Sequence, residues 1–228
     1  MEPQQRVLYL RYQDVVLNDN TANTNRFNMA LSTFVVVDAN AKNRIVACAL
    51  VSGETTEDYE WILKQLLESS SGVAPGVLLV DEDSAMEAAS ANIIPQTTVL
   101  NCIWHLCSLN LAKNLQGALR SDWQTFLPRF WTARNALTPD EFDRMWSALA
   151  RDFGGRNRTG VESYLQRLYD RRQRWAWAWV GSQFTAGMQS TQRVEKSHDL
   201  IKREVRSLRT CSVPLSGGSL MKTSRTPT

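Results

Sequence analysis

The chain has 228 residues and a mass of 25.8 kDa, which suits one large domain or a core domain that carries an insertion. Apolar residues make up 43% of the chain, so we do not expect a disordered protein. No apolar run reaches the ~20 residues of a membrane-spanning helix, and the N-terminus has no signal-peptide pattern. We therefore expect neither a membrane protein nor a secreted one. Residues 1–110 contain 6 Lys and Arg against 13 Asp and Glu, whereas residues 111–228 contain 20 Lys and Arg against 10 Asp and Glu. This asymmetry indicates an acidic part that could gather cations and a basic part that could contact a polyanion. The alternative is that both parts are ordinary solvated surfaces.

The first half of the chain predicts an α/β architecture with a mixed sheet. Its short apolar, β-branched runs are typical of strands, and the turn-forming stretch 39–43 predicts a hairpin between two of them. Apolar residues at helical spacing after Thr55 and Thr56, which are good N-cap residues, predict a helix with one buried face. Strands are expected at 14–19, 31–38, 44–51, 77–80 and 97–100, and helices after Thr55 and at 84–92.

From about Leu109 the strand signals end and helical segments follow, with breaks expected near Pro128, Thr138-Pro139 and Gly154-Gly155. Six of the eight tryptophans fall here, which indicates a hydrophobic core, with base stacking as the alternative. A last amphipathic helix is expected over 191–206. The predicted division is a core at 1–107, a helical insertion at 108–185, a last core helix region at 186–207 and a disordered tail at 208–228.

Two aspartates follow apolar strands directly. Asp19 and Asp81 each come at the C-terminal end of a predicted strand, the edge where α/β proteins build their sites. Turn-forming or helix-capping aspartates are the alternative for each. Phosphoryl chemistry on nucleic acid needs two or three such carboxylates on neighbouring elements, because they hold a pair of Mg²⁺ ions.

Four short motifs stand in a fixed order along the chain: DNTANTNRF at 19–27, VDEDSAM at 80–86, CIWH at 102–105 and FTAGMQSTQRVE at 184–195. Together they resemble the blocks of the Mutator-like element (MULE) transposase domain. The last block is also similar to that of the plant far-red-impaired-response regulators, which look like domesticated transposases. The resemblance covers roughly residues 10–206.

The resemblance implies a ribonuclease H-like fold: a mixed sheet with an all-helical insertion before the last catalytic helix. It implies a DDE triad of Asp19, Asp81 and Glu195 that binds two Mg²⁺ or Mn²⁺ ions, and we expect these three carboxylates to converge within about 10 Å. It also implies that Cys102 and His105 lie near the site, for which we expect a structural role.

Zinc is not expected. Cys102, His105 and Cys107 offer three ligands, but the fourth would have to come from a distant cysteine. His198 follows Glu195 at helical spacing, so a metal-ligand role stays open beside that of an ordinary histidine. Ala22 replaces the tyrosine common in the family. The zinc modules that family members usually carry are not found in this sequence, which is typical of a truncated copy or an isolated catalytic domain.

Basic side chains in the second half are candidates for binding DNA phosphates, with solvated helix faces as the alternative. The function predicted from the resemblance is metal-dependent DNA strand cleavage and transfer by a DDE transposase, on transposon ends and target DNA, in the nucleus, with a homo-oligomer allowed for. The alternative is a catalytically inactive derivative that acts as a DNA-binding, transcription-regulatory or interaction module. The DNA-binding candidates are Arg171, Arg172, Arg174, Lys196, Lys202, Arg203 and Arg206.

Overall fold

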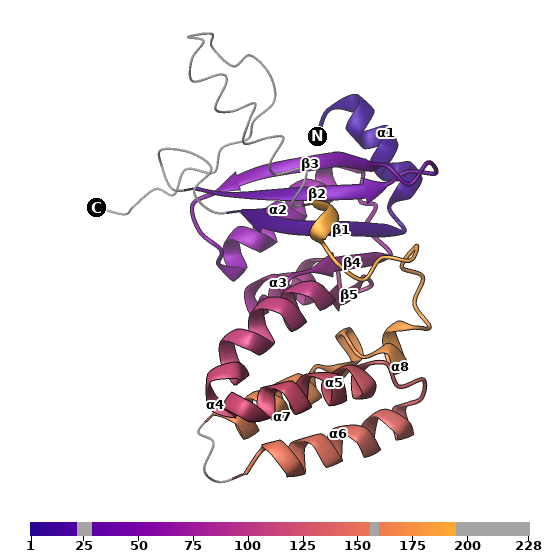
Figure 1. Ribbon diagram of the computed structural model, residues 1–228. Coiled ribbons are helices and arrows are strands. Elements are labelled where there is room, and N and C mark those ends of the chain that lie inside the picture. Colours follow the sequence, from indigo (N-terminus) through magenta and orange to yellow (C-terminus); the bar gives the residue numbers. More distant parts are fainter. Residues whose placement is uncertain (22–28, 156–159, 195–228) are drawn as a thin grey trace, which may run out of the picture. The chain divides into compact units, whose positions relative to one another are not determined.

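The computed structural model describes residues 1–21, 29–155 and 160–194, and the chain divides into two compact units (Figure 1). The first unit comprises Met1–Val99 and the segment from Ser190, and the second comprises Leu100–Gln189. No helix in the described ranges is long and apolar enough to cross a membrane. The domain limits predicted at 107 and 185 remain predictions, and the predicted tail at 208–228 lies outside the described residues.

The sheet has five strands in the order β3-β2-β1-β4-β5. Strand β1 pairs antiparallel with β2 and parallel with β4, and β2 pairs antiparallel with β3. An antiparallel meander continued by a parallel neighbour of its first strand is the arrangement of the ribonuclease H-like fold, so the predicted fold class is confirmed. The strands are β1 (Val15–Thr21), β2 (Ala30–Val37), β3 (Asn43–Val51), β4 (Val77–Val80) and β5 (Thr98–Asn101).

Two helices of the first unit begin where the sequence predicts them. Helix α2 (Thr56–Ser69) begins after Thr55, whose side chain accepts a hydrogen bond from the backbone N–H of Asp58. Helix α3 (Ser84–Ile93) begins after Asp83, whose carboxylate accepts from the backbone N–H groups at the start of the helix. These caps satisfy backbone donors that have no partner within the helix.

Helix α1 (Pro3–Tyr12) is not predicted from the sequence, because its apolar residues do not form a stripe along one side. Tyr9 is fully buried, whereas Val7 is 66% exposed. The available signal is at the N-terminus of the helix, where Glu2 and Gln5 form a capping box around Pro3.

One face of the sheet forms the core of the first unit with these helices. Apolar side chains from β1, β2 and β4 pack against one side of α2 and α3 and against Tyr9 of α1. The fully buried members include Val16, Phe34, Leu78, Tyr59, Leu63 and Ala89.

The second unit is helical, as predicted for the insertion: after the end of β5, its described residues contain no strand. The sequence predicts a break near Pro128, and this prediction is wrong, because α5 runs through Pro128. Burial of Phe126 and Phe130 on either side of the proline outweighs the lost hydrogen bond. The helices are η1 (His105–Gln116, a π-helix), α4 (Gly117–Leu119), η2 (Arg120–Asp122), α5 (Trp123–Arg134), α6 (Pro139–Phe153), α7 (Val161–Asp170), η3 (Arg172–Arg174) and α8 (Trp177–Val180).

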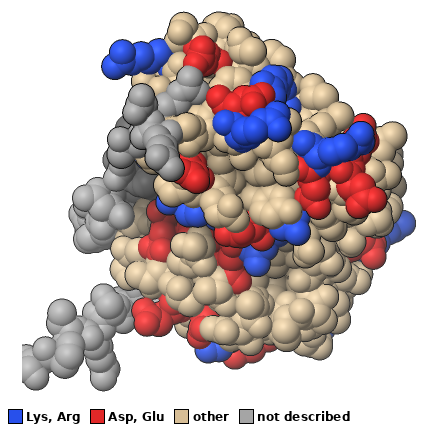
Figure 2. Space-filling model, turned by 90° about the horizontal axis from the view of Figure 1, so that it is seen from below, with Lys and Arg blue, Asp and Glu red and all other residues tan. Residues whose placement is uncertain are grey.

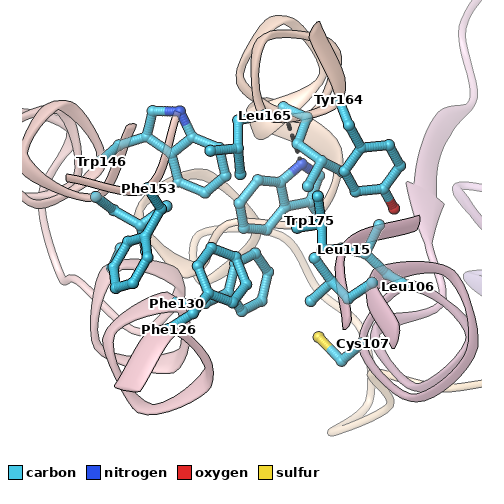
Figure 3. Packing of buried hydrophobic residues seen from close by; sticks show 14 of the residues in the cluster. Leu106, Cys107, Leu115, Phe126, Phe130, Trp146, Phe153, Tyr164, Leu165 and Trp175 are labelled. Atoms are coloured by element: carbon cyan, nitrogen blue, oxygen red, sulfur yellow. Dashed lines mark hydrogen bonds between the residues drawn. The ribbon is translucent and has the colours of Figure 1, made fainter. Parts of the chain in front are cut away.

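Trp175 lies at the centre of the core of the second unit (Figure 3). Its ring stacks on Phe130 with centroids 5.4 Å apart, lies 5.4 Å from the ring of Trp146, and donates a hydrogen bond of 3.0 Å to the carbonyl of Leu168. Trp123, Trp146 and Trp175 are buried, and the other four tryptophans of the unit are partly buried: Trp104, Trp131, Trp177 and Trp179. The core interpretation of the tryptophans is therefore confirmed.

We expect Trp175→Ala to lower the free energy of unfolding by about 3–5 kcal/mol, because it leaves a large cavity among aromatic rings. Phe184→Ala is the control, since Phe184 is 67% exposed, and it should change stability by less than about 0.5 kcal/mol. Urea unfolding followed by circular dichroism measures both. Equal, small losses for the two variants would contradict the central role of Trp175.

Candidate active site

The parallel pairing of β1 and β4 determines where the two strand-end aspartates lie. Asp19 is in β1, and Asp81 directly follows β4. Leu17 of β1 lies opposite Leu79 of β4. If the same register continued for two more residues, Asp19 would lie opposite Asp81, and neighbouring strands are about 5 Å apart.

Both aspartates lie on the face of the sheet opposite α2 and α3. Side chains alternate along a strand, and Val16 and Leu78 belong to the core on the helix side. Asp19 and Asp81 have the opposite parity, so they point to the other face. Asp19 is 5% exposed and Asp81 is half-buried, which places the two carboxylates where water screens their charges little.

Thr191 joins this site from the far end of the chain. Its side chain is fully buried, and its hydroxyl donates a hydrogen bond of 3.3 Å to Oδ1 of Asp81. A helical turn over 192–194 follows, and the next residue in the sequence is Glu195, which lies outside the described residues, as does His198. Thr191, four residues before the third predicted acid in the sequence, is therefore held beside the second one. Convergence of all three carboxylates stays a prediction.

Asp83, two residues after Asp81, has a structural role. Its Oδ1 caps α3, and its Oδ2 accepts a hydrogen bond of 2.8 Å from the hydroxyl of Tyr59. Asn20 in turn donates to that hydroxyl at 2.6 Å. Burial and the bond to Asp83 raise the pKa of Tyr59, which stays a neutral donor. The N-cap of α3 is thus Asp83.

Glu54 is an acid of this region that sequence reasoning missed. Partial burial, then the negative charge of Asp83 and, more weakly, of Asp81 raise the pKa of Glu54, while a hydrogen bond with Asn20 opposes the rise. The site therefore concentrates negative charge. Glu54 lies between β3 and α2 in no recognisable motif, so no signal in the sequence points to it.

Cys102 and His105 lie in the second unit at the start of η1. Cys102 is fully buried, and its Sγ accepts a hydrogen bond of 3.5 Å from the backbone N–H of His105. The ring of Trp104 meets that of His105 edge-on at 5.0 Å. Cys107 is buried in the apolar core of the unit. These contacts favour the predicted structural role, while the placement of Cys102 and His105 near the acids stays a prediction.

The three predicted DNA-binding arginines between α7 and α8 make contacts inside the second unit. The guanidinium of Arg172 lies 4.1 Å from the centre of the Tyr169 ring and 5.4 Å from that of Trp179. Burial lowers the pKa of Arg174, and Arg171 is partly buried. Packing is thus one role of these side chains, and contact with phosphates stays a prediction.

Basic and acidic side chains are interspersed on the face shown in Figure 2. Among the described ion pairs of the second unit, Arg129 lies 2.8 Å from Asp152, to which Arg151 also donates. The described surface of that view therefore has no large area of a single charge. The four basic candidates beyond residue 195, which are Lys196, Lys202, Arg203 and Arg206, lie outside the described residues.

Comparison with known proteins confirms the resemblance found in the sequence. Residues 15–109 match the family model of the MULE transposase domain. Protein FAR-RED IMPAIRED RESPONSE 1 of Arabidopsis thaliana is 28% identical over 86% of this chain, and Protein FAR1-RELATED SEQUENCE 4 of the same plant is 28% identical over 93% of it. The chain spans 23% and 28% of the length of these two relatives.

Solved structures similar to the chain include two retroviral integrase catalytic core domains. That of BIV integrase covers 70% of the chain and is itself covered to 98%, with 14% identity and a TM-score of 0.30. That of HTLV-2 integrase in complex with magnesium covers 46% of the chain and is covered to 70%, with 13% identity and a TM-score of 0.28. Because both scores are low, the fold assignment depends on the strand order described above.

We expect Glu54→Gln to raise the thermal midpoint at pH 7, because it removes a carboxylate whose ionised form is disfavoured. When folding raises the pKa of a carboxyl group, the protein becomes less stable as the pH rises through that pKa. The increase in thermal midpoint from Glu54→Gln should therefore be smaller at pH 4 than at pH 7. Glu57→Gln is the control, since Glu57 lies favourably in the first turn of α2 and its loss should not stabilise. Calorimetry at both pH values measures this, and a gain from Glu54→Gln that is larger at pH 4 would contradict it.

Proposed function

Because this chain is a relative of the MULE transposase domain and of the FAR-RED IMPAIRED RESPONSE proteins, we propose that it is a DDE-type transposase catalytic domain that cleaves and transfers DNA strands with divalent cations. The observation that supports the proposal is the parallel register of β1 and β4, which pairs Leu17 with Leu79 two residues before Asp19 and Asp81. Glu195 is the third acid of the proposed triad.

The chemistry of this region suits Mg²⁺ or Mn²⁺. Carboxylate oxygens are the ligands that these hard cations prefer, and Asp19, Asp81 and Glu195 would supply them to two ions. Burial first, and then the negative charges of Asp83 and more weakly of Asp81, raise the pKa of Glu54, so a further carboxylate lies within electrostatic reach of Asp81. A divalent cation would relieve this repulsion, so the residues present fit the proposed metal.

Bound cations would activate the attacking oxygen and stabilise the leaving oxygen of a phosphodiester. The protein contributes positioning and charge. Strands β1 and β4 fix the backbones of Asp19 and Asp81, and the Thr191 hydroxyl restricts rotation of the Asp81 carboxylate. In the proposed sequence of reactions, water first attacks at the transposon end, and the freed 3′-hydroxyl then attacks target DNA.

The partners in this proposal are transposon ends and target DNA, with the protein acting in the nucleus and assembling as a homo-oligomer on two ends. The basic second half of the chain would supply phosphate contacts, which position DNA without reading its sequence. The described chain spans about a quarter of the length of its curated relatives, so recognition of particular ends is a separate question.

The second candidate function is a catalytically inactive derivative that binds DNA or another protein and regulates transcription. The names of the similar relatives favour it, since they refer to a far-red response and not to transposition. Cleavage distinguishes the two candidates, because an inactive derivative would bind DNA without cutting it.

We expect Asp81→Asn to reduce Mg²⁺- or Mn²⁺-dependent plasmid nicking by about a hundredfold or more, because it removes a ligand charge while nearly keeping the shape of the side chain. DNA binding should stay within about twofold, since phosphate contacts come from basic residues. Asp14→Asn is the matched control, because Asp14 is exposed and precedes the opposite end of β1. Nicking that survives in Asp81→Asn would exclude the site, and an unmutated chain that binds but never nicks would favour the inactive derivative.

Reversing the charges of Lys202 and Arg203 to glutamate should weaken DNA binding equally for unrelated sequences. It should also reduce the slope of log affinity against log salt concentration by about 2, one for each phosphate that the protein no longer neutralises. The control is the double reversal Arg11→Glu with Lys64→Glu, which makes the same change in net charge in helices α1 and α2 of the acidic half. Binding titrations at several salt concentrations measure both. An equal effect of the two double variants would show that only net charge matters.

A further inference from the structure

The turn between β2 and β3 is fixed by Asp38. Its Oδ1 accepts the backbone N–H groups of Asn40 and Lys42, both at 2.9 Å, and its Oδ2 accepts Nε of Arg44 at 2.7 Å. The N–H of Lys42 and then the Arg44 guanidinium hold the pKa of Asp38 below its usual value, so these bonds are present at neutral pH. Ala41 adopts the left-handed conformation, with φ of 56°, and this conformation lets the chain reverse direction in the turn.

This turn is hydrogen-bonded to Arg193, which lies 150 residues further along the chain than Asn43. Nδ2 of Asn43 donates to the carbonyl of Arg193 at 2.9 Å. Nη1 of Arg193 donates back to Oδ1 of Asn43 at 3.2 Å and to the carbonyl of Ala41 at 3.1 Å. We call Ala41, Asn43 and Arg193 the hairpin latch. Because Asn43 both donates and accepts, a carboxylate or an apolar side chain cannot replace it fully.

The hairpin latch lies two residues from the contact with the candidate active site. Thr191 and Val194 are fully buried, and the N–H of Val194 bonds the carbonyl of Thr191 at 2.6 Å, so the segment between them is a tight turn. Figure 1 shows this short yellow helical segment against the sheet near β1. Residue 191 is thus held on Asp81, while residue 193 is held on the β2–β3 turn.

We propose that Asn43 and Arg193 are positioning residues of the metal site: the hairpin latch holds Thr191 on Asp81. The inference rests on the proposed function, because it assigns the latch to the same Asp81. Neither latch side chain is a proposed ligand. Their action is on the orientation of the Asp81 carboxylate, through the hydroxyl of Thr191.

A positioning role predicts a different effect from a role in folding. The latch bonds are solvent-exposed, and such bonds contribute little to the stability of the fold. The geometry of a metal site is more sensitive, since removal of a residue that orients a ligand typically lowers metal affinity by about 10- to 100-fold. The effect on cation binding should therefore exceed the effect on unfolding.

The test uses the full chain and compares Asn43→Ala with Asn40→Ala, the same substitution at an exposed asparagine of the same turn. We expect Asn43→Ala to weaken Mn²⁺ binding in calorimetric titration by about tenfold or more and to speed amide hydrogen exchange over 189–194. Asn40→Ala should change neither. Arg193→Ala should resemble Asn43→Ala, and Arg193→Lys, which keeps one donor group, should restore part of the affinity. The metal-free thermal midpoints should stay close to that of the unmutated chain.

The readouts separate failure of this inference from failure of the proposed function. If Asp81→Asn abolishes Mn²⁺ binding and Asn43→Ala leaves it unchanged, the site stands and the positioning role is wrong. If the unmutated chain binds no Mn²⁺, the proposed function fails and the positioning role fails with it, whereas hydrogen exchange still shows whether the latch holds the segment. Unchanged exchange in Asn43→Ala would overturn the latch itself.

Discussion

The parallel pairing of β1 with β4 is the constraint on which the candidate site depends. Both strands are short, and the residues that pair are buried, with Val16 and Leu78 in the core on the helix side. A slip of one residue would turn every side chain of a strand to the opposite face and would expose this core. Burial of apolar side chains therefore fixes the register of β1 and β4, which ends two residues before Asp19 and Asp81.

The same constraint gathers acids that repel one another. Hydrogen bonds from neutral donors offset part of this cost: Tyr59 donates to Asp83, and Thr191 donates to Asp81. Burial of Glu54, and then the negative charge of Asp83, still raise the pKa of Glu54. A local conflict that the rest of the fold compensates is typical of functional sites, where the arrangement serves chemistry at some expense of stability.

Sequence patterns predict the elements that burial and capping determine. Strand β4 reads as four apolar residues before an aspartate, and α2 follows a capping threonine, so both are found from periodicity and local chemistry. Helix α1 is missed because its apolar residues lie on several sides. The contact of Asn43 with Arg193 is missed for a different reason, since it joins positions 150 residues apart and depends on the shape of a turn. The raised pKa of Glu54 is missed because it depends on burial and on acids that only folding brings near this residue.

The interactions that hold the chain near the proposed acids differ in how well they tolerate substitutions. Asp19 and Asp81 are fixed by strand pairing within a hydrophobic core, which many apolar substitutions would preserve. The segment leading to Glu195 is fixed by a few directed hydrogen bonds at Asp81 and at the β2–β3 turn, each of which a single substitution removes. A derivative of this fold can therefore lose cleavage at those bonds or at the acids while it keeps its stability.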